Sequence, residues 1–441
     1  MKNPSRWRVA ALLAGLVLVV GVVALHARQT QNLSPKDRTA VFETVWKDIR
    51  DIYYDPQFHG VDWKAAHDRY RPMLDAVTSD AEFYTLVNRM IGELHDAHTR
   101  LNTPEQWENR HKFQGVSTGL QLDEVDGRVV VSGVLPDSSA AAAGVEPGSI
   151  LLRVGGKSIA DALAASAEKT PESSTDRLTR LRIVAGVLSG QAGSTVALTV
   201  QRPDGSSSDV SLKREVLPQP PDVRSRRLAS GAGYFRFDGF EPNVDTEFSV
   251  ALADYRAAPG LIIDLRRNGG GRLDIMLSIA GLFFDRETVF SRMMNRQQVT
   301  LAEKSAAQKQ QNVRVGRNDV AVGFSGPVVV LTSTRTASAS ELLAGGLQEL
   351  GRAKVIGTQT CGCVVGIAGE QHMKGGGVLE ISQLLWFTPA GRKLEGDGVM
   401  PDRIVMPTLT DLQQHRDVVL EAAENLLRQM AHPVAPASQL R

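Results

Sequence analysis

The stretch VVVLTSTRTASASELLAGG, residues 328–346, joins a buried strand to a helix and places hydroxyl groups at the junction. Its first four residues are apolar, which is typical of a strand in a sheet covered on both faces. A helix beginning near Ser338 leaves the Oγ atom of this serine close to unsatisfied helix N–H groups. A nucleophile whose attack creates an oxyanion is well placed there, although serine is also a favoured helix cap.

The alternation of strand and helix continues on both sides. Strand-like runs occupy residues 231–237, 260–266 and 353–357, and helix-like runs occupy residues 244–256 and 272–284. This alternation predicts a mostly parallel sheet with helices on both faces, and sites in such sheets form beyond the carboxyl ends of the strands.

Three consecutive glycines follow one of these strand ends, in LIIDLRRNGGG (residues 261–271). Glycine permits positive φ angles and lets backbone N–H groups face a ligand. A plain strand-to-helix turn needs one glycine and rarely three, so this turn is a candidate part of a site.

Upstream, the pattern changes twice. From Pro35 to about Leu101, apolar residues recur at spacings of three and four, which predicts helices. Residues 113–215 contain short strand-like runs punctuated by glycine, with two helical stretches between them. Three prolines within residues 218–221 mark a stiff connector to the sheet.

The first residues have the pattern of an export signal. A basic segment with Lys2, Arg6 and Arg8 precedes an unbroken apolar run over residues 9–25. This arrangement predicts a signal peptide, or a short membrane anchor if it is retained. Because the basic end stays inside the cell, we expect the rest of the chain to be periplasmic or extracellular.

Composition excludes several classes of protein. A net charge of +1 provides no field that favours nucleic acid. The two cysteines, Cys361 and Cys363, are too few for a disulfide scaffold or a four-thiolate zinc site. We expect no metal and no cofactor, and composition does not indicate an oligomeric state.

A serine nucleophile needs a base, and few residues qualify. His95 and His98 lie at the predicted end of the N-terminal helices, in ELHDAHTRL. Two histidines three residues apart could also bind a metal, but a third ligand is missing at a suitable spacing. Glu395 lies in the glycine-rich segment LEGDGVMPD, where a solvated turn is the alternative interpretation.

Together these motifs resemble the carboxy-terminal processing, or tail-specific, serine peptidases and their tricorn-core-like relatives. The core signatures correspond to LIIDLRRNGGG and to TASASELLAGGLQELGRAKVIG (residues 336–357). The resemblance implies a multidomain α+β protein. Its N-terminal segment would be helical, its β-rich domain PDZ-like, and its α/β core, with a mostly parallel sheet, similar to ClpP and crotonase.

The expected organisation has six parts. They are a signal peptide or membrane anchor (1–27), a helical N-terminal domain (34–107), a PDZ-like domain (113–215), an α/β serine peptidase core (228–410), a C-terminal helix (411–430) and a tail (431–441).

The resemblance also implies roles for single residues. The nucleophile corresponds to Ser338, with Thr336 in the place of the first serine of the family's stretch. The oxyanion hole would consist of the N–H group of Ala339 and one from Gly270 or Gly271.

The base differs between branches of this family. The processing branch uses a lysine, but the corresponding segment TCGCV has Cys363 at that position. The tricorn-like branch uses a histidine, which implies His98 as the base and Glu395 as the carboxylate that orients it. That branch has a serine before its histidine, where this chain has Ala97. Ser338, His98 and Glu395 fit the logic of a catalytic triad.

The expected function is therefore that of an exported serine endopeptidase. Its polypeptide substrates would be unfolded, or recognised by free C-termini at the backbone of the PDZ-like carboxylate loop, which comprises Gly119, Leu120, Gln121 and Leu122. One alternative is a catalytically inactive PDZ scaffold, which the missing lysine favours. Another is a thiol-based redox or metal function, but the Cys-Gly-Cys sequence has no thioredoxin-like context.

The cysteine pair itself has two possible states. In an oxidising compartment, thiols seldom stay free, so Cys361 and Cys363 are expected to form a local reducible disulfide. Gly362 can supply the unusual backbone angles that such a small ring needs. The alternative is a pair of small buried thiols.

Overall fold

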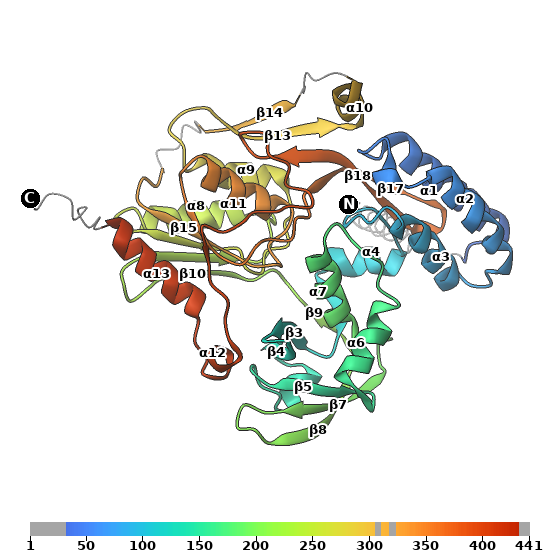
Figure 1. The fold of residues 1–441 in the computed structure, drawn as a ribbon, viewed down its shortest axis with the longest axis horizontal. Coiled ribbons are helices and arrows are strands. Elements are labelled where there is room, and N and C mark those ends of the chain that lie inside the picture. The colour runs from blue at the N-terminus through green and yellow to red at the C-terminus, as the bar shows by residue number, and fades with distance from the viewer. Residues whose placement is uncertain (1–31, 305–309, 317–322, 432–441) are drawn as a thin grey trace, which may run out of the picture.

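The computed structural model describes residues 32–304, 310–316 and 323–431 (Figure 1). The expected signal peptide or anchor lies outside the described residues, as does nearly all of the expected tail. Within the described ranges, no helix is long and apolar enough to cross a membrane.

A six-stranded sheet forms the centre of the core. Its strands are parallel to their neighbours, except that the first pairs antiparallel with the second. In spatial order they are β10 (Val223–Arg227), β11 (Gly233–Phe237), β12 (Leu261–Asp264), β15 (Val328–Thr332), β16 (Lys354–Gly357) and β19 (Arg403–Ile404).

Helices cover both faces of this sheet because its strands are apolar on both sides. Leu261 and Ile263 pack on one face, and the intervening Ile262 packs on the other. The first face is covered by α8 (Val244–Asp254), α9 (Leu273–Gly281) and α11 (Ala339–Glu349), and the second by α13 (Val418–Ala431) (Figure 1).

Two expected boundaries of the core were wrong. The core begins before residue 228, because the polar run at Val223–Arg227 pairs with β11 as an edge strand. The expected single helix over 411–430 is divided into α12 (Leu409–Gln413) and α13. His415 has a positive φ of 54° at the break, and the Asp417 carboxylate then accepts the Leu420 N–H group at the start of α13.

The N-terminal helices pack on a second sheet and share its core. These helices are α1 (Pro35–Ile52), α2 (Trp63–Tyr70) and α3 (Asp80–Gly92). Phe42 and Val45 of α1 lie in one apolar cluster with Leu379 and Ile381 of the sheet. Region 34–107 is therefore continuous with the core, which its periodicity did not indicate.

This second sheet is antiparallel. It comprises β1 (Arg100–Asn102), β18 (Val378–Phe387), β13 (Thr288–Asn295) and β14 (Gln311–Val315), with β17 (Val365–His372) also paired to β18. Two helices adjoin its strands in sequence, α4 (Pro104–His111) and α10 (Arg296–Lys304).

Residues 118–214 form an inserted domain on a two-stranded stalk, β2 (Gln114–Ser117) with β9 (Glu215–Pro218). Its sheet has the order β3 (Leu120–Val125), β4 (Arg128–Val134), β5 (Ile150–Val154), β7 (Thr195–Gln201) and β8 (Ser207–Lys213), with β6 (Lys157–Ser158) beside β5. Its helices are α5 (Ser139–Ala142), α6 (Ile159–Ala167) and α7 (Asp176–Gly186). Helix α7 lies toward the core, and the sheet extends away from it (Figure 1).

Candidate active site

Ser338 lies at the turn between β15 and α11 in a backbone conformation that is rare for a residue with a side chain. Its φ is 58° and its ψ is −124°. The Ser338 N–H group donates to Glu341 Oε2 and to the Cys363 carbonyl oxygen, at 3.0 Å each. Strained backbone of this kind persists only where its surroundings hold it, and it clusters at active sites.

The glycine turn packs directly against Ser338. A Cβ atom at Gly270, where φ is 105°, would lie 2.6 Å from the Cβ and 3.1 Å from the Oγ of Ser338. A Cβ atom at Gly271 would lie 2.7 Å from the Phe240 carbonyl oxygen. Both positions therefore need glycine, because any side chain would collide with the serine or with backbone.

The N–H groups around Ser338 differ in their availability. The Gly270 N–H group donates to Asn268 Oδ1 at 2.9 Å. Among the described residues, the Gly271 and Ala339 N–H groups have no hydrogen-bond partner. Two backbone N–H groups on the segments that border Ser338 are thus available to a ligand.

Glu341 is a fully buried carboxylate beneath Ser338, and the sequence analysis did not select it. Besides the Ser338 N–H group, it accepts the Thr360 hydroxyl at 2.5 Å, the Gly362 N–H group at 2.7 Å and the Cys363 N–H group at 3.0 Å. Burial raises the pKa of Glu341 to about 7, against the effect of these hydrogen bonds. Glu341 therefore joins the start of α11 to the Cys-Gly-Cys loop.

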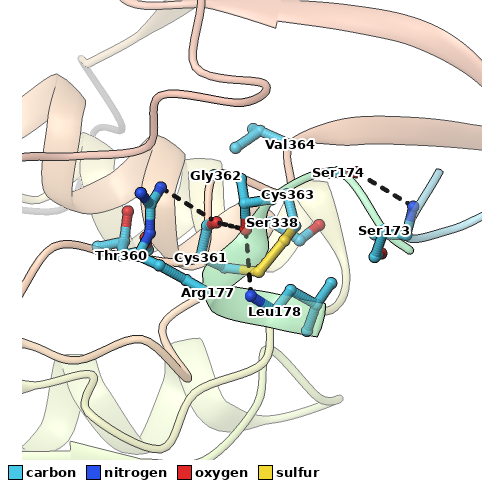
Figure 2. The surroundings of a disulfide bond; sticks show 12 residues. Ser173, Ser174, Arg177, Leu178, Ser338, Thr360, Cys361, Gly362, Cys363 and Val364 are labelled. Carbon is cyan, nitrogen blue, oxygen red and sulfur yellow. Dashed lines mark hydrogen bonds between the residues drawn. A yellow bond between two sulfur atoms is a disulfide. The ribbon is translucent and has the colours of Figure 1, made fainter. Parts of the chain in front are cut away.

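Cys361 and Cys363 form a disulfide in this loop (Figure 2). Their Cα atoms are 5.2 Å apart, and both residues are 2% exposed. Gly362 between them has a φ of 74°, and a Cβ atom there would lie 2.8 Å from the Gly396 carbonyl oxygen. Of the two expected states, the structure has the bridge, so position 363 carries no free thiol.

Glu395 lies on the neighbouring loop, 5% exposed. Its Oε2 atom accepts the Val364 N–H group at 2.5 Å. Burial raises the pKa of Glu395 to about 7, while a hydrogen bond from the Ser174 hydroxyl opposes that rise. A cavity of about 250 Å³ opens beside this carboxylate, lined by Tyr54, His59, His95, Ser173, Ser174, Lys393, Glu395 and Gly396.

His98 lies on a loop and not on a helix, because α3 ends at Gly92. Asp96 shapes this loop by accepting the His98 N–H group at 2.9 Å. Nδ1 of His98 is buried and has no hydrogen-bond partner among the described residues. Burial lowers the pKa of His98, and the charges of Arg100 and Arg182 act in the same direction.

The structure links two of the three expected catalytic residues closely. Ser338 and Glu395 are both hydrogen bonded to the segment that contains the disulfide, through Cys363 and Val364 respectively. Within the described part of the chain, no hydrogen bond joins the His98 imidazole to either residue. Catalytic hydrogen bonds are often long in free enzymes and tighten with substrate.

Other residues that could accept a proton form ion pairs. The His95 side chain is 48% exposed and pairs with Glu172 at 3.4 Å. No group of metal-ligating side chains occurs in the ranges that the structure describes. Lys354 pairs with Asp402 at 3.0 Å, so it is engaged elsewhere.

The loop of the inserted domain that was expected to bind a peptide carboxylate has only some of its backbone groups available. The Gly119 N–H group donates to Ser117 Oγ at 2.9 Å, and Leu120 and Leu122 are buried in the core of the domain. The Leu122 carbonyl oxygen accepts a hydrogen bond of 2.6 Å from Arg335, a core residue. Gln121 lies between them on β3, an edge strand of its sheet.

Three residues of the site were not predicted from the sequence, and they differ in how visible they are in its pattern. Glu341 stands three residues after Ser338, which is the spacing of a capping box. Asn268 precedes the glycines, where its side chain can bond backbone two residues on, as it does at Gly270. Ser174 has no local signal, because its partner Ala97 lies 77 residues away.

Comparisons with known proteins agree with this architecture. The pattern described as peptidase family S41 matches residues 231–405, and the tricorn protease C1 domain matches residues 34–92. A carboxyl-terminal-processing protease of Picosynechococcus is 28% identical over 97% of this chain and 99% of the relative. A tricorn protease homolog of Streptomyces coelicolor is 27% identical over 88% of this chain, which spans only 32% of that relative.

Solved structures share the fold. Mature CPAF superposes with a TM-score of 0.69 at 15% identity, covering 91% of this chain and 99% of that one. The photosystem II D1 C-terminal processing protease gives a TM-score of 0.56 at 22% identity, covering 90% of this chain and 98% of that one.

Proposed function

The chain belongs to peptidase family S41 and is a serine peptidase, and from this premise we propose which residues act and on what. Ser338 is the nucleophile, His98 is the general base, and Glu395 orients and stabilises the protonated imidazole. The enzyme is an exported endopeptidase that cleaves unfolded polypeptides or those recognised by a free C-terminus.

The observation that carries this proposal is the environment of Ser338. Its strained backbone lies at a strand-to-helix turn, against a glycine whose missing side chain leaves room for the Ser338 side chain. The N–H groups of Ala339 and Gly271, which have no partner in the described part of the chain, lie on the two bordering segments. Because the Gly270 N–H group is engaged by Asn268, Gly271 is the better second donor to an oxyanion.

The reaction follows from these positions. The Ser338 Oγ atom attacks the scissile carbonyl carbon while its proton passes to His98. The carbonyl oxygen becomes an oxyanion that the two backbone N–H groups stabilise. Collapse expels the amine, which takes the proton from His98, and leaves an acyl-enzyme. Water, deprotonated by His98, then releases the acid and restores Ser338.

His98 is the favoured base because it lies in the motif that supplies a histidine in the tricorn-like branch, and because several alternatives are engaged. Cys363 is held in a disulfide and has no thiolate to accept a proton. Lys354 and Lys374 form ion pairs with Asp402 and Asp37. The buried Nδ1 atom of His98 has no partner among the residues that the structure describes, and in a triad the carboxylate orients the imidazole through this atom.

Hydrolysis of an unfolded protein such as casein tests the proposal. Ser338→Ala should reduce turnover to background without altering the fold, which circular dichroism checks. The comparison variant is Ser340→Ala, since Ser340 is buried and its hydroxyl bonds to Asn268. Loss of turnover in Ser340→Ala combined with normal turnover in Ser338→Ala would show that the nucleophile is misassigned.

A further inference from the structure

One segment of the inserted domain, residues 173–182, touches the three loops that border the proposed site. These are the His98 loop (96–99), the disulfide loop (360–363) and the Glu395 loop (394–398). All of these contacts are hydrogen bonds between side chains of the segment and groups on the loops. The inserted domain therefore supplies part of the framework of the site.

Ser174 makes the central contact of this segment. Its Oγ atom accepts the Ala97 N–H group at 3.1 Å, directly before His98. Ser174 and Glu395 line the same cavity, where the Ser174 hydroxyl lowers the pKa of the carboxylate. Residue 97 is an alanine, so the His98 loop offers no hydroxyl of its own there.

The neighbours of Ser174 hold all three loops against this point. Thr175 donates to the Cys361 carbonyl oxygen at 2.9 Å, and Arg177 donates to the Thr360 carbonyl oxygen at 3.1 Å. The Arg177 guanidinium also donates to the Cys361 carbonyl oxygen (Figure 2). Arg177 also reaches the Gly396 carbonyl oxygen at 3.3 Å. Arg182 donates to the Ala97 carbonyl oxygen at 3.1 Å.

We infer that Ser174 is a positioning residue of the peptidase, supplied to the active site by the inserted domain. One hydroxyl holds the loop that carries the base and lines the same cavity as the carboxylate that orients it, so it influences their relative placement. This inference rests on the proposed function of His98 and Glu395. Small displacements of catalytic groups are costly, because reacting atoms must meet in a narrow geometry.

The Ser174 hydroxyl also stabilises the charged form of Glu395. Without this donor, the pKa of Glu395 rises, and a higher pH is needed to ionise it. Other titratable or charged groups around this carboxylate are Asp96, Glu341, Tyr54, His59, His95 and Lys393. They remain in place when only the Ser174 hydroxyl is removed, so a shift in the pH profile reports on that one hydroxyl.

The test compares Ser174→Ala with Ser174→Thr in the full-length enzyme, using casein hydrolysis. Loss of the bond to the Ala97 N–H group displaces the His98 loop, which predicts a kcat lowered by about 10-fold or more. KM should change little, and the acid limb of the pH profile should move to higher pH. Ser174→Thr keeps a hydroxyl and should restore most of the rate.

Ser158→Ala is the matched control. This serine also accepts a backbone N–H group, from Asp161 at 3.2 Å, but at the start of α6 within the inserted domain. It should retain the wild-type kcat and pH profile. If the wild-type enzyme is active and Ser174→Ala has the same kcat and the same acid limb, the inference about Ser174 is overturned and the proposed function is not. An inactive wild-type enzyme would overturn the proposed function as well.

Discussion

At the scale of single residues, Ser338 shows how the site is held. A non-glycine residue with this backbone conformation costs about 1–3 kcal/mol. Its N–H group is fixed by Glu341 and Cys363, and Gly270 leaves room for its side chain. The local cost is thus offset by contacts from three separate segments, which hold Ser338 in this conformation.

We expect Glu395, and not His98, to set the pH dependence of activity. Burial lowers the pKa of His98, so the imidazole stays neutral below its ordinary value. Burial raises the pKa of Glu395 to about 7, so this carboxylate loses its charge as the pH falls through 7. We expect kcat/KM to decline below about pH 7, at a higher pH than the unperturbed histidine value of about 6.5.

The variant Glu395→Gln distinguishes the titration of Glu395 from that of His98. The variant should lose about 10²-fold or more in kcat, because the imidazolium lacks its counter-charge. Its remaining activity should persist to lower pH, since only His98 then titrates. A wild-type acid limb in Glu395→Gln would assign that limb to another group, with Glu341 as the first candidate.

At the scale of elements, one buried carboxylate joins a helix to a loop. Glu341 of α11 accepts three donors from residues 360–363. Glu341→Ala would leave them buried without partners, and each such group costs about 1–3 kcal/mol. We expect the free energy of unfolding, from urea denaturation, to fall by at least about 2 kcal/mol.

A second glutamate on the same helix provides the comparison for this stability measurement. Glu349 accepts the Thr388 hydroxyl at 3.0 Å and the Ala390 N–H group at 2.7 Å, but near the protein surface. Its alanine variant should lose less stability, because water can satisfy the released donors. Equal losses in the two variants would be inconsistent with the role given to Glu341.

Although the disulfide lies next to Ser338, we expect its removal to have only a small effect on the rate of hydrolysis. The loop is also held by Glu341, Thr175 and Arg177, so its backbone has supports that do not depend on sulfur. Replacing both cysteines by serine should leave measurable casein hydrolysis, with the loss appearing as lower thermal stability. If Cys363→Ser alone eliminated turnover while the fold persisted, position 363 would have a catalytic role and His98 would not be the base.

Helices and strands could be predicted from the sequence more reliably than the tertiary contacts between them. Apolar strands such as residues 261–264 and 328–332 are visible because both of their faces are buried. The edge strand Val223–Arg227 is polar and exists only through its pairing with β11. The segment of Ser338 and its glycine turn could be located from local pattern, whereas Ser174 could not, because tertiary contacts alone bring it to the site.

At the scale of the whole molecule, the inserted domain is braced against the core at several points. Besides the segment at the active site, Asp126 accepts the Leu409 N–H group of α12 at 2.9 Å. Arg335, three residues before Ser338, forms an ion pair with Asp123 and donates a hydrogen bond to the Leu122 carbonyl oxygen. The edge strand proposed to receive peptide termini therefore contacts the segment that leads to the nucleophile.

Peptide binding tests this arrangement. If the inserted domain receives a free C-terminus by strand addition, amidation of a test peptide should weaken binding, measured by fluorescence anisotropy. Arg335→Ala should strengthen binding of the free acid, because the Leu122 carbonyl becomes available to the peptide. Equal affinity for the acid and amide forms would argue for a structural role of the domain.

The central claim is that Ser338 is a nucleophile activated by His98. Its most direct test is labelling of the full-length protein with a fluorophosphonate, followed by mass spectrometry of the modified peptide. We predict one adduct, on Ser338, formed rapidly in the wild-type protein and at least about 10²-fold more slowly in His98→Ala, because triad members act as a unit. An adduct on another serine, or an unchanged labelling rate in folded His98→Ala, would contradict the account.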